Sequence, residues 1–78
     1  LAMVERAEDL LREQGFRQFR VRIHGTNARI ELLPEDIPRM LDENIRKEIV
    51  DKLKRYGFTY ITLDLEGYRT GSMNEVLV

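Results

Sequence analysis

The first part of the chain changes from a helical to a strand-like pattern of apolar residues. Between residues 3 and 14, apolar side chains recur every three or four positions, which places them on one face of a helix. These side chains are Met3, Ala7, Leu10 and Leu11. Gly15 can end this helix, because glycine adopts a positive φ at no steric cost. A strand is predicted from Phe16 to about His24, since apolar and charged residues then alternate. Its apolar positions are Phe19, Val21 and Ile23.

A second alternating segment, residues 28–33, is predicted to pair with this strand as a hairpin. Gly25 and Thr26 supply the turn chemistry between the two. A loop of two residues and a loop of four give the same antiparallel register, whereas a slip of one residue would set apolar against charged positions throughout. The register pairs Phe19 with Leu32, Val21 with Ile30 and Ile23 with Ala28. On the other face it sets Arg20 opposite Glu31 and Arg22 opposite Arg29.

The second half of the chain repeats the order of helix and strand. Pro34 suits the first position of a short helical turn, and Asp42 is a plausible cap for the main second helix. The apolar side of that helix carries Ile45, Ile49, Val50, Leu53 and Tyr56, and Gly57 ends it. A third strand is predicted over residues 58–65. Its apolar face carries Ile61, Leu63 and Leu65, and its other face carries Tyr60, Thr62 and Asp64.

An internal similarity supports this division. Residues 9–25 and 51–67 align without a gap at a constant offset of 42. Either the two segments arose by an old duplication, or two helix-to-strand units simply use the same limited set of residue types. The order αββαβ predicts one domain, residues 1–78, of the α+β class. We expect a two-layer sandwich, in which a three-stranded mixed sheet has two helices on one face and a right-handed crossover follows the second strand.

Two helices can cover one face of this sheet, so the other face is expected to be uncovered. It carries Arg20, Arg22, Arg29, Glu31, Thr62 and Asp64. Arg22 opposite Arg29 is a local conflict with stability, since like charges that face each other on a sheet are destabilising. The planar guanidinium matches phosphate well. The face is therefore either a phosphate or carboxylate site, with Arg20, Arg22 and Arg29 as ligands, or an ordinary wet surface on which Glu31 and Asp64 neutralise the arginines.

Other polar residues are weaker candidates for an anion site. His24 beside the turn glycine is either a turn residue or a ligand contact. The segment of residues 66–75 contains Arg69 and Ser72 between two glycines and could present N–H groups and hydroxyls to an anion, or it could only tether the end of the chain. Glu8 lies on the polar side of the first helix, where charged residues are usually solvated. Asp64 joins these candidates through its place on the uncovered face.

Composition narrows the classes of function. The 13 basic and 14 acidic residues give a formal charge of −1, so general attraction to nucleic acid or to an anionic membrane is not supported. An RNA-binding domain would stack bases on aromatic residues of its sheet, and only Tyr60 is expected on the uncovered face. The chain has no cysteine and one histidine, which excludes disulfides, a cysteine nucleophile and a multi-histidine metal site. We predict no metal site and no catalytic residue in this chain. We expect a cytoplasmic protein without a membrane segment.

Three segments together resemble a known family: residues 20–25 (Arg-Val-Arg-Ile-His-Gly), 28–31 (Ala-Arg-Ile-Glu) and 63–75. The chain resembles the C-terminal domain of the LarE-type ATP-dependent sacrificial sulfur transferases, in the PP-loop ATP pyrophosphatase superfamily. The resemblance implies an N-terminal domain that binds ATP, with Mg²⁺, and adenylates a carboxylate of a pyridinium mononucleotide. A protein cysteine or a cluster-borne sulfur then supplies sulfur for a nickel-pincer cofactor.

The resemblance also implies roles for particular residues. Arg20 and Arg22 would bind phosphate, and Glu8 would lie near the same site. The PP-loop signature (Ser-Gly-Gly-Xaa-Asp-Ser) and every cysteine are missing here, so we expect a C-terminal fragment of a larger enzyme that holds no cofactor and is not catalytic alone. Its expected partners are the N-terminal PP-loop domain of the same chain, the pyridinium mononucleotide and further copies in a homo-oligomer. The alternative is a small oligomerisation or regulatory module without a ligand of its own.

Overall fold

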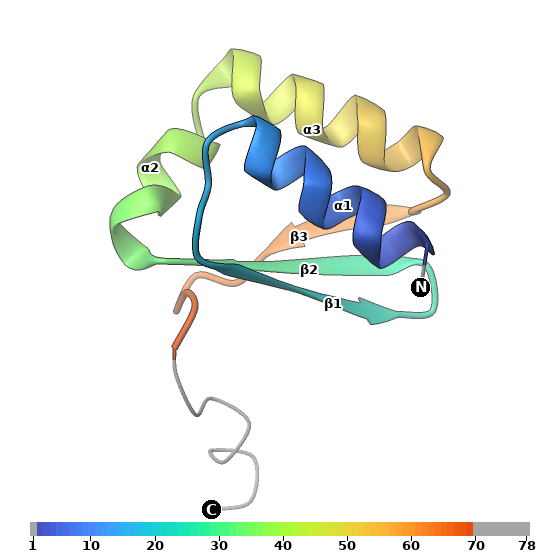
Figure 1. Ribbon diagram of the computed structural model, residues 1–78, viewed down its shortest axis with the longest axis horizontal. Helices are drawn as coiled ribbons and strands as arrows, with labels where there is room; N and C mark the ends of the chain where they lie inside the picture. The colour runs from blue at the N-terminus through green and yellow to red at the C-terminus, as the bar shows by residue number, and fades with distance from the viewer. Residues whose placement is uncertain (1, 70–78) are drawn as a thin grey trace, which may run out of the picture.

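The computed structural model describes residues 2–69 and has the predicted α+β architecture. A three-stranded sheet in the order β1-β2-β3 forms one layer, with β1 antiparallel and β3 parallel to the central strand β2. Helices α1 and α3 both lie on one face of this sheet (Figure 1). The elements are α1 (Ala2–Glu13), β1 (Phe19–His24), β2 (Asn27–Leu32), the 3₁₀ turn η1 (Pro34–Asp36), α2 (Ile37–Met40), α3 (Glu43–Arg55) and β3 (Tyr60–Leu63). The short helix α2 was not predicted as a separate element.

The hairpin has the predicted register. Phe19 pairs with Leu32, Val21 with Ile30 and Ile23 with Ala28, while Arg20 lies opposite Glu31 and Arg22 opposite Arg29. The two-residue loop of Gly25 and Thr26 joins the strands, and Gly25 has a φ of +62°. The alternation of side chains therefore fixes the register, because only this pairing brings the apolar sides of both strands to the face that α1 and α3 cover.

The two long helices end in the same way. Gly15 and Gly57 have φ values of +93° and +114°. The phenylalanine that follows each glycine donates its N–H to the carbonyl five residues earlier, at 3.0 and 3.1 Å. Phe16 and Phe58 are both buried, which is the hydrophobic contact that commonly accompanies such a helix end. The internal similarity at the offset of 42 thus corresponds to a repeated turn from helix to strand.

The core lies between the helices and the sheet. Its largest fully buried side chains come from α1, β2 and α3 together with the first of the two phenylalanines: Leu10, Leu11, Phe16, Ile30, Leu32, Ile49 and Leu53. Each such side chain contributes about 1.5–3 kcal/mol relative to an exposed one. The predicted apolar faces of α1, β1, β2 and α3 all supply this core. The core therefore holds the sheet rigid and leaves its other face to polar residues.

Two predicted strands were too long. β1 begins at Phe19 rather than at Phe16, and β3 ends at Leu63. Leu65 was expected on the apolar face but is 83% exposed. The cause is a turn at Asp64, whose carbonyl accepts the N–H of Gly67 at 3.1 Å and whose side chain accepts the N–H of Glu66 at 2.9 Å. This turn directs the chain away from the edge of β3.

The first prediction concerns the cap of α3. The Asp42 carboxylate accepts the N–H of Ile45 at 3.1 Å, so Asp42→Ala should lower the free energy of unfolding by about 1 kcal/mol. Asp51→Ala is the matched control, because Asp51 is an exposed residue inside the same helix and alanine favours helix there. Urea unfolding monitored by circular dichroism compares the two variants. Equal midpoints for both would contradict a stabilising cap at Asp42.

Candidate functional site

The sheet face opposite the helices is organised around one buried carboxylate. Glu31 in β2 is only 2% exposed. Its Oε2 accepts hydrogen bonds from Arg22 Nε and from Arg29 Nη2, both at 3.0 Å. Its Oε1 lies 3.8 Å from Arg20 Nη1, an ion-pair distance. A fully buried glutamate is rare unless it is paired, and here three arginines surround it.

The three arginines come from both strands of the hairpin because of its register. Arg20 and Arg22 project from β1, and Arg29 and Glu31 project from β2 on the same side. Arg29 also approaches the carboxylate of Asp64, just after β3, with Nε 3.9 Å from Oδ2. We refer to these five residues as the Arg–Glu cluster. The expected conflict between Arg22 and Arg29 is relieved, since both donate to the same oxygen of Glu31.

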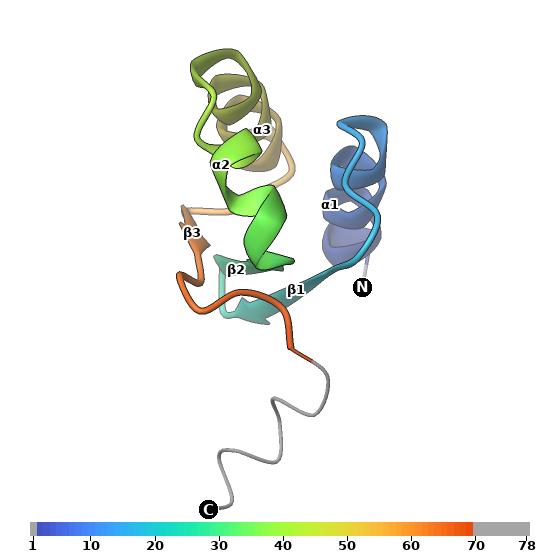
Figure 2. The ribbon, with the colours of Figure 1, turned by 90° about the vertical axis from the view of Figure 1, so that its left-hand side faces the viewer.

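The segment after β3 covers part of this face, which was expected to be bare. Gly67 is buried with a φ of +87°, and the N–H of Tyr68 donates to the carbonyl of Leu32. The ring of Tyr68 then lies 5.2 Å from the guanidinium carbon of Arg20. Figure 2 shows this segment crossing the sheet on the side away from α1 and α3. The cluster is consequently a partly enclosed site rather than a fully solvated surface.

The electrostatics of the cluster leave an excess of positive charge. Three guanidiniums face two carboxylates, so the five residues carry one net positive charge. Among residues 2–69, Glu31 Oε1 and Arg29 Nε are buried without a hydrogen-bond partner. Arg20, Arg22 and Arg29 keep 30%, 24% and 40% of their side chains exposed. An anion from solvent can therefore reach all three arginines, whereas Glu31 is inaccessible.

The other predicted site residues lie elsewhere. Glu8 is on α1, on the opposite side of the sheet, and forms an ion pair with Arg12 at 3.9 Å. His24 is exposed at the end of β1 that lies next to the hairpin turn. Arg69 follows Tyr68 and pairs with Glu66 at 2.7 Å. Ser72 lies outside the described residues. The structure thus brings Arg20, Arg22, Arg29 and Asp64 together but does not bring Glu8 or His24 to them.

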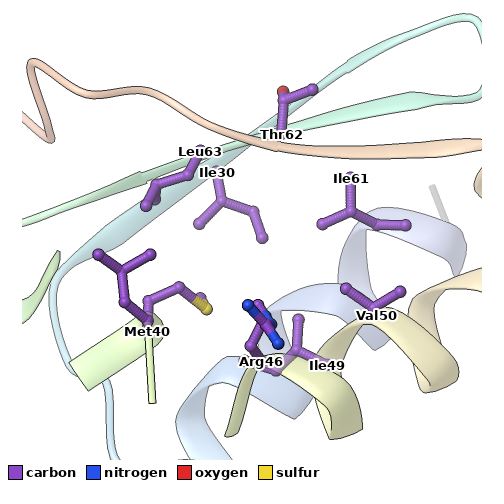
Figure 3. A pocket seen from close by; sticks show the side chains of 9 residues that line it. Ile30, Met40, Arg46, Ile49, Val50, Ile61, Thr62 and Leu63 are labelled. Atoms are coloured by element: carbon purple, nitrogen blue, oxygen red, sulfur yellow. The ribbon is translucent and has the colours of Figure 1, made fainter. Parts of the chain in front are cut away.

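A separate groove opens on the helix side of the sheet, beside β3. Its volume is about 190 Å³, and it is mainly apolar, with side chains from α2, α3 and the sheet. Figure 3 shows the side chains that line it, among them the exposed Arg46 of α3. No sequence pattern predicted this groove, because apolar residues that line it, such as Ile30, Ile49 and Ile61, were predicted only as parts of the apolar faces of their helix and strands. It lies on the other face from the Arg–Glu cluster and adds no group to it.

Other classes of site lack a counterpart in residues 2–69. None of the helices in this range is long and apolar enough to cross a membrane. The same residues place no group of three or more His, Asp or Glu side chains together for a metal ion. On the outside of α3, the hydrogen bond that Lys52 donates to Glu48 raises the pKa of Lys52. That exposed pair belongs to the helix surface, so the Arg–Glu cluster remains the main candidate.

Two curated proteins are similar to nearly the whole chain. An uncharacterized protein of Synechocystis sp. is 47% identical over 77 residues, and the pyridinium-3,5-bisthiocarboxylic acid mononucleotide synthase of Lactiplantibacillus plantarum is 46% identical over 77 residues. Each match covers 99% of this chain but only 29% and 27% of the respective relative. The chain thus spans less than a third of the length of these relatives. No protein-family model matches it.

The second prediction concerns the turn that covers the cluster. A Cβ added at Gly67 would lie 2.7 Å from the carbonyl oxygen of Leu32, whereas one added at Gly25 would meet nothing within 4 Å. Both residues have a positive φ, so Gly25→Ala should cost about 1–2 kcal/mol from backbone strain alone. Gly67→Ala should cost more, because the steric clash adds to the strain. Chemical unfolding measures both free energies, and an equal loss would show that the close approach at Leu32 has no energetic weight.

Proposed function

We propose that this chain is the phosphate-binding and assembly part of an ATP-dependent sulfur transferase that acts on a pyridinium mononucleotide. The main support is the 46% identity to a protein named as a pyridinium-3,5-bisthiocarboxylic acid mononucleotide synthase. This name agrees with the LarE-type resemblance of residues 20–25, 28–31 and 63–75. The similarity extends over 99% of the chain, so it includes the whole Arg–Glu cluster.

The chemistry of such a substrate fits the cluster. A mononucleotide carries a phosphate monoester, and guanidinium groups bind phosphate through short charge-assisted hydrogen bonds. Arg20, Arg22 and Arg29 are partly exposed cations around a buried carboxylate, and Arg29 also approaches the carboxylate of Asp64. The structural observation that supports the proposal beside this identity is that Arg20 and Arg22 are partly exposed in a cluster with one net positive charge. In our proposal both side chains hold the phosphate of the substrate.

The remaining steps belong to the parent protein. ATP and Mg²⁺ would bind to an N-terminal PP-loop domain, and the sulfur donor would also lie outside this chain, which has no cysteine. This chain would orient the mononucleotide by its phosphate while its carboxylate reacts in the neighbouring domain. The parent would be a cytoplasmic homo-oligomer. The isolated chain would have no turnover of its own.

The third prediction tests Arg22. Arg22→Ala in the full-length protein should lower sulfur transfer to the pyridinium mononucleotide by more than about tenfold, because one charge-assisted phosphate contact is worth about 1.5–3 kcal/mol. Arg17→Ala is the matched control, since Arg17 is an exposed arginine that precedes β1. Steady-state assays of both variants provide the measurement, and thermal unfolding verifies that each is folded.

The alternative module without a ligand predicts a different result. If the sheet face served only to join copies of the chain, Arg22→Ala would change the sedimentation of the protein and leave binding of nicotinic acid mononucleotide unchanged. Full activity in a folded Arg22→Ala variant would refute the proposed site.

A further inference from the structure

We propose that Glu31 is a positioning residue of the phosphate site, and that Arg29 is its charge partner rather than a phosphate ligand. This inference rests on the proposed function in so far as the anion is a substrate phosphate. It divides the three arginines into two classes. Arg20 and Arg22 contact the anion, and Glu31 with Arg29 and Asp64 sets the orientation of Arg22.

The geometry of Arg22 is the first step of the argument. A guanidinium has two edges that can each make two parallel hydrogen bonds, one that includes Nε and one formed by Nη1 and Nη2. Arg22 uses Nε to reach Glu31 at 3.0 Å. Within residues 2–69, its Nη1 and Nη2 atoms make no hydrogen bond. Glu31 therefore fixes the plane of the group and leaves the outer edge available for an anion.

Arg29 is oriented differently. Its Nη2 donates to the same oxygen of Glu31 at 3.0 Å, and its Nε lies 3.9 Å from Asp64. Carboxylates thus lie at both ends of its guanidinium. Because one positive group between two negative groups has little remaining attraction for another anion, Arg29 is suited to neutralise the buried Glu31. A carboxylate that is only 2% exposed requires such paired positive groups.

The two possible roles of Glu31, positioning of Arg22 and simple neutralisation of charge, predict opposite changes in phosphate affinity when Glu31 is neutralised. If Glu31 were only a counter-ion, its neutralisation would raise the net charge around Arg20 and Arg22 and would strengthen phosphate binding. If Glu31 positions Arg22, the same substitution would release the guanidinium and weaken phosphate binding. The sign of the change in affinity therefore distinguishes the two roles, and a general loss of packing would not reproduce a phosphate-specific effect.

The experiment measures the phosphate contribution to binding in the full-length protein. Calorimetric titrations with nicotinic acid mononucleotide and with nicotinic acid riboside, which lacks the phosphate, give two Kd values. The Kd of the riboside divided by the Kd of the nucleotide gives the contribution of the phosphate to binding. Glu31→Gln should lower this ratio by about tenfold, the scale of one hydrogen bond to a charged group. An unchanged or increased ratio would overturn the proposal.

Two further variants separate the effect of the position of the Glu31 carboxylate from the effect of its charge. Glu31→Asp keeps the negative charge but withdraws the carboxylate by one methylene, and it should also lower the ratio. The double variant Arg29→Gln with Glu31→Gln keeps the original net charge and should remain as weak as Glu31→Gln. A wild-type ratio in either variant would show that only charge matters and would refute a positioning role. If Glu31→Gln does not fold, Glu31→Asp decides the question.

An NMR measurement keeps this inference separate from the proposed function. If the wild-type protein binds the nucleotide and the riboside equally, the substrate assignment fails, but the role of Glu31 can still be tested. The Nε–H signal of Arg22 should exchange slowly with solvent in the wild type and at least about tenfold faster in Glu31→Asp, because the hydrogen bond is broken. Inorganic phosphate should shift this signal in the wild type alone. Equal exchange in both proteins would refute the orientation by Glu31.

Discussion

The buried Glu31 is the interaction on which the polar half of this structure depends. Arg22 and Arg29 face each other across the hairpin, and they are compatible because both donate to one oxygen of Glu31 at 3.0 Å. Such an arrangement is sensitive to loss of a partner: when one member of a buried ion pair is removed, the charge that stays behind costs about 3–5 kcal/mol. That loss is comparable to the entire stability of a small domain. The carboxylate therefore joins β1 to β2 on the polar face, as the apolar pairs join them on the other.

The two faces of the sheet bury different kinds of side chain. The face under α1 and α3 is built from side chains that any helix-on-sheet domain would bury, and its packing requires no ligand. The opposite face buries a charge in a chain of 78 residues. A domain of this size buries a smaller fraction of its surface than a larger domain does, so an unfavourable buried group weighs heavily on its stability. Proteins commonly depart from the simplest packing where they bind something. The burial of Glu31 and the partial exposure of Arg20 and Arg22 are such a departure, and it coincides with the segments that resemble the sulfur transferases.

Much of the fold was predictable because short-range patterns determine it. Alternation fixed the hairpin register, and Gly15 and Gly57 marked the ends of both long helices. The sequence also placed Arg20, Arg22, Arg29 and Glu31 on one face. It did not reveal that Glu31 is buried, because the alternation gives the face on which a side chain lies and not how closely Arg20, Arg22 and Arg29 gather around it. Nor did it end β3 at Leu63, since Leu65 continues the alternation and only the hydrogen bonds at Asp64 make the turn. The alternation of apolar and polar residues could not predict the long-range contacts that the loops make.

The small charge excess of the cluster limits what this chain can do alone. The protein as a whole carries a charge of −1, so no general field draws an anion toward the sheet, and physiological salt screens charges beyond about 8 Å. In the proposed site, recognition of phosphate would therefore come from the direction of two guanidiniums rather than from charge density. Two such contacts give modest affinity, because each contributes about 1.5–3 kcal/mol and association itself is costly. A mononucleotide would need further contacts to its ring and ribose, and the relatives, which are more than three times as long as the matched region, have the additional chain to provide them.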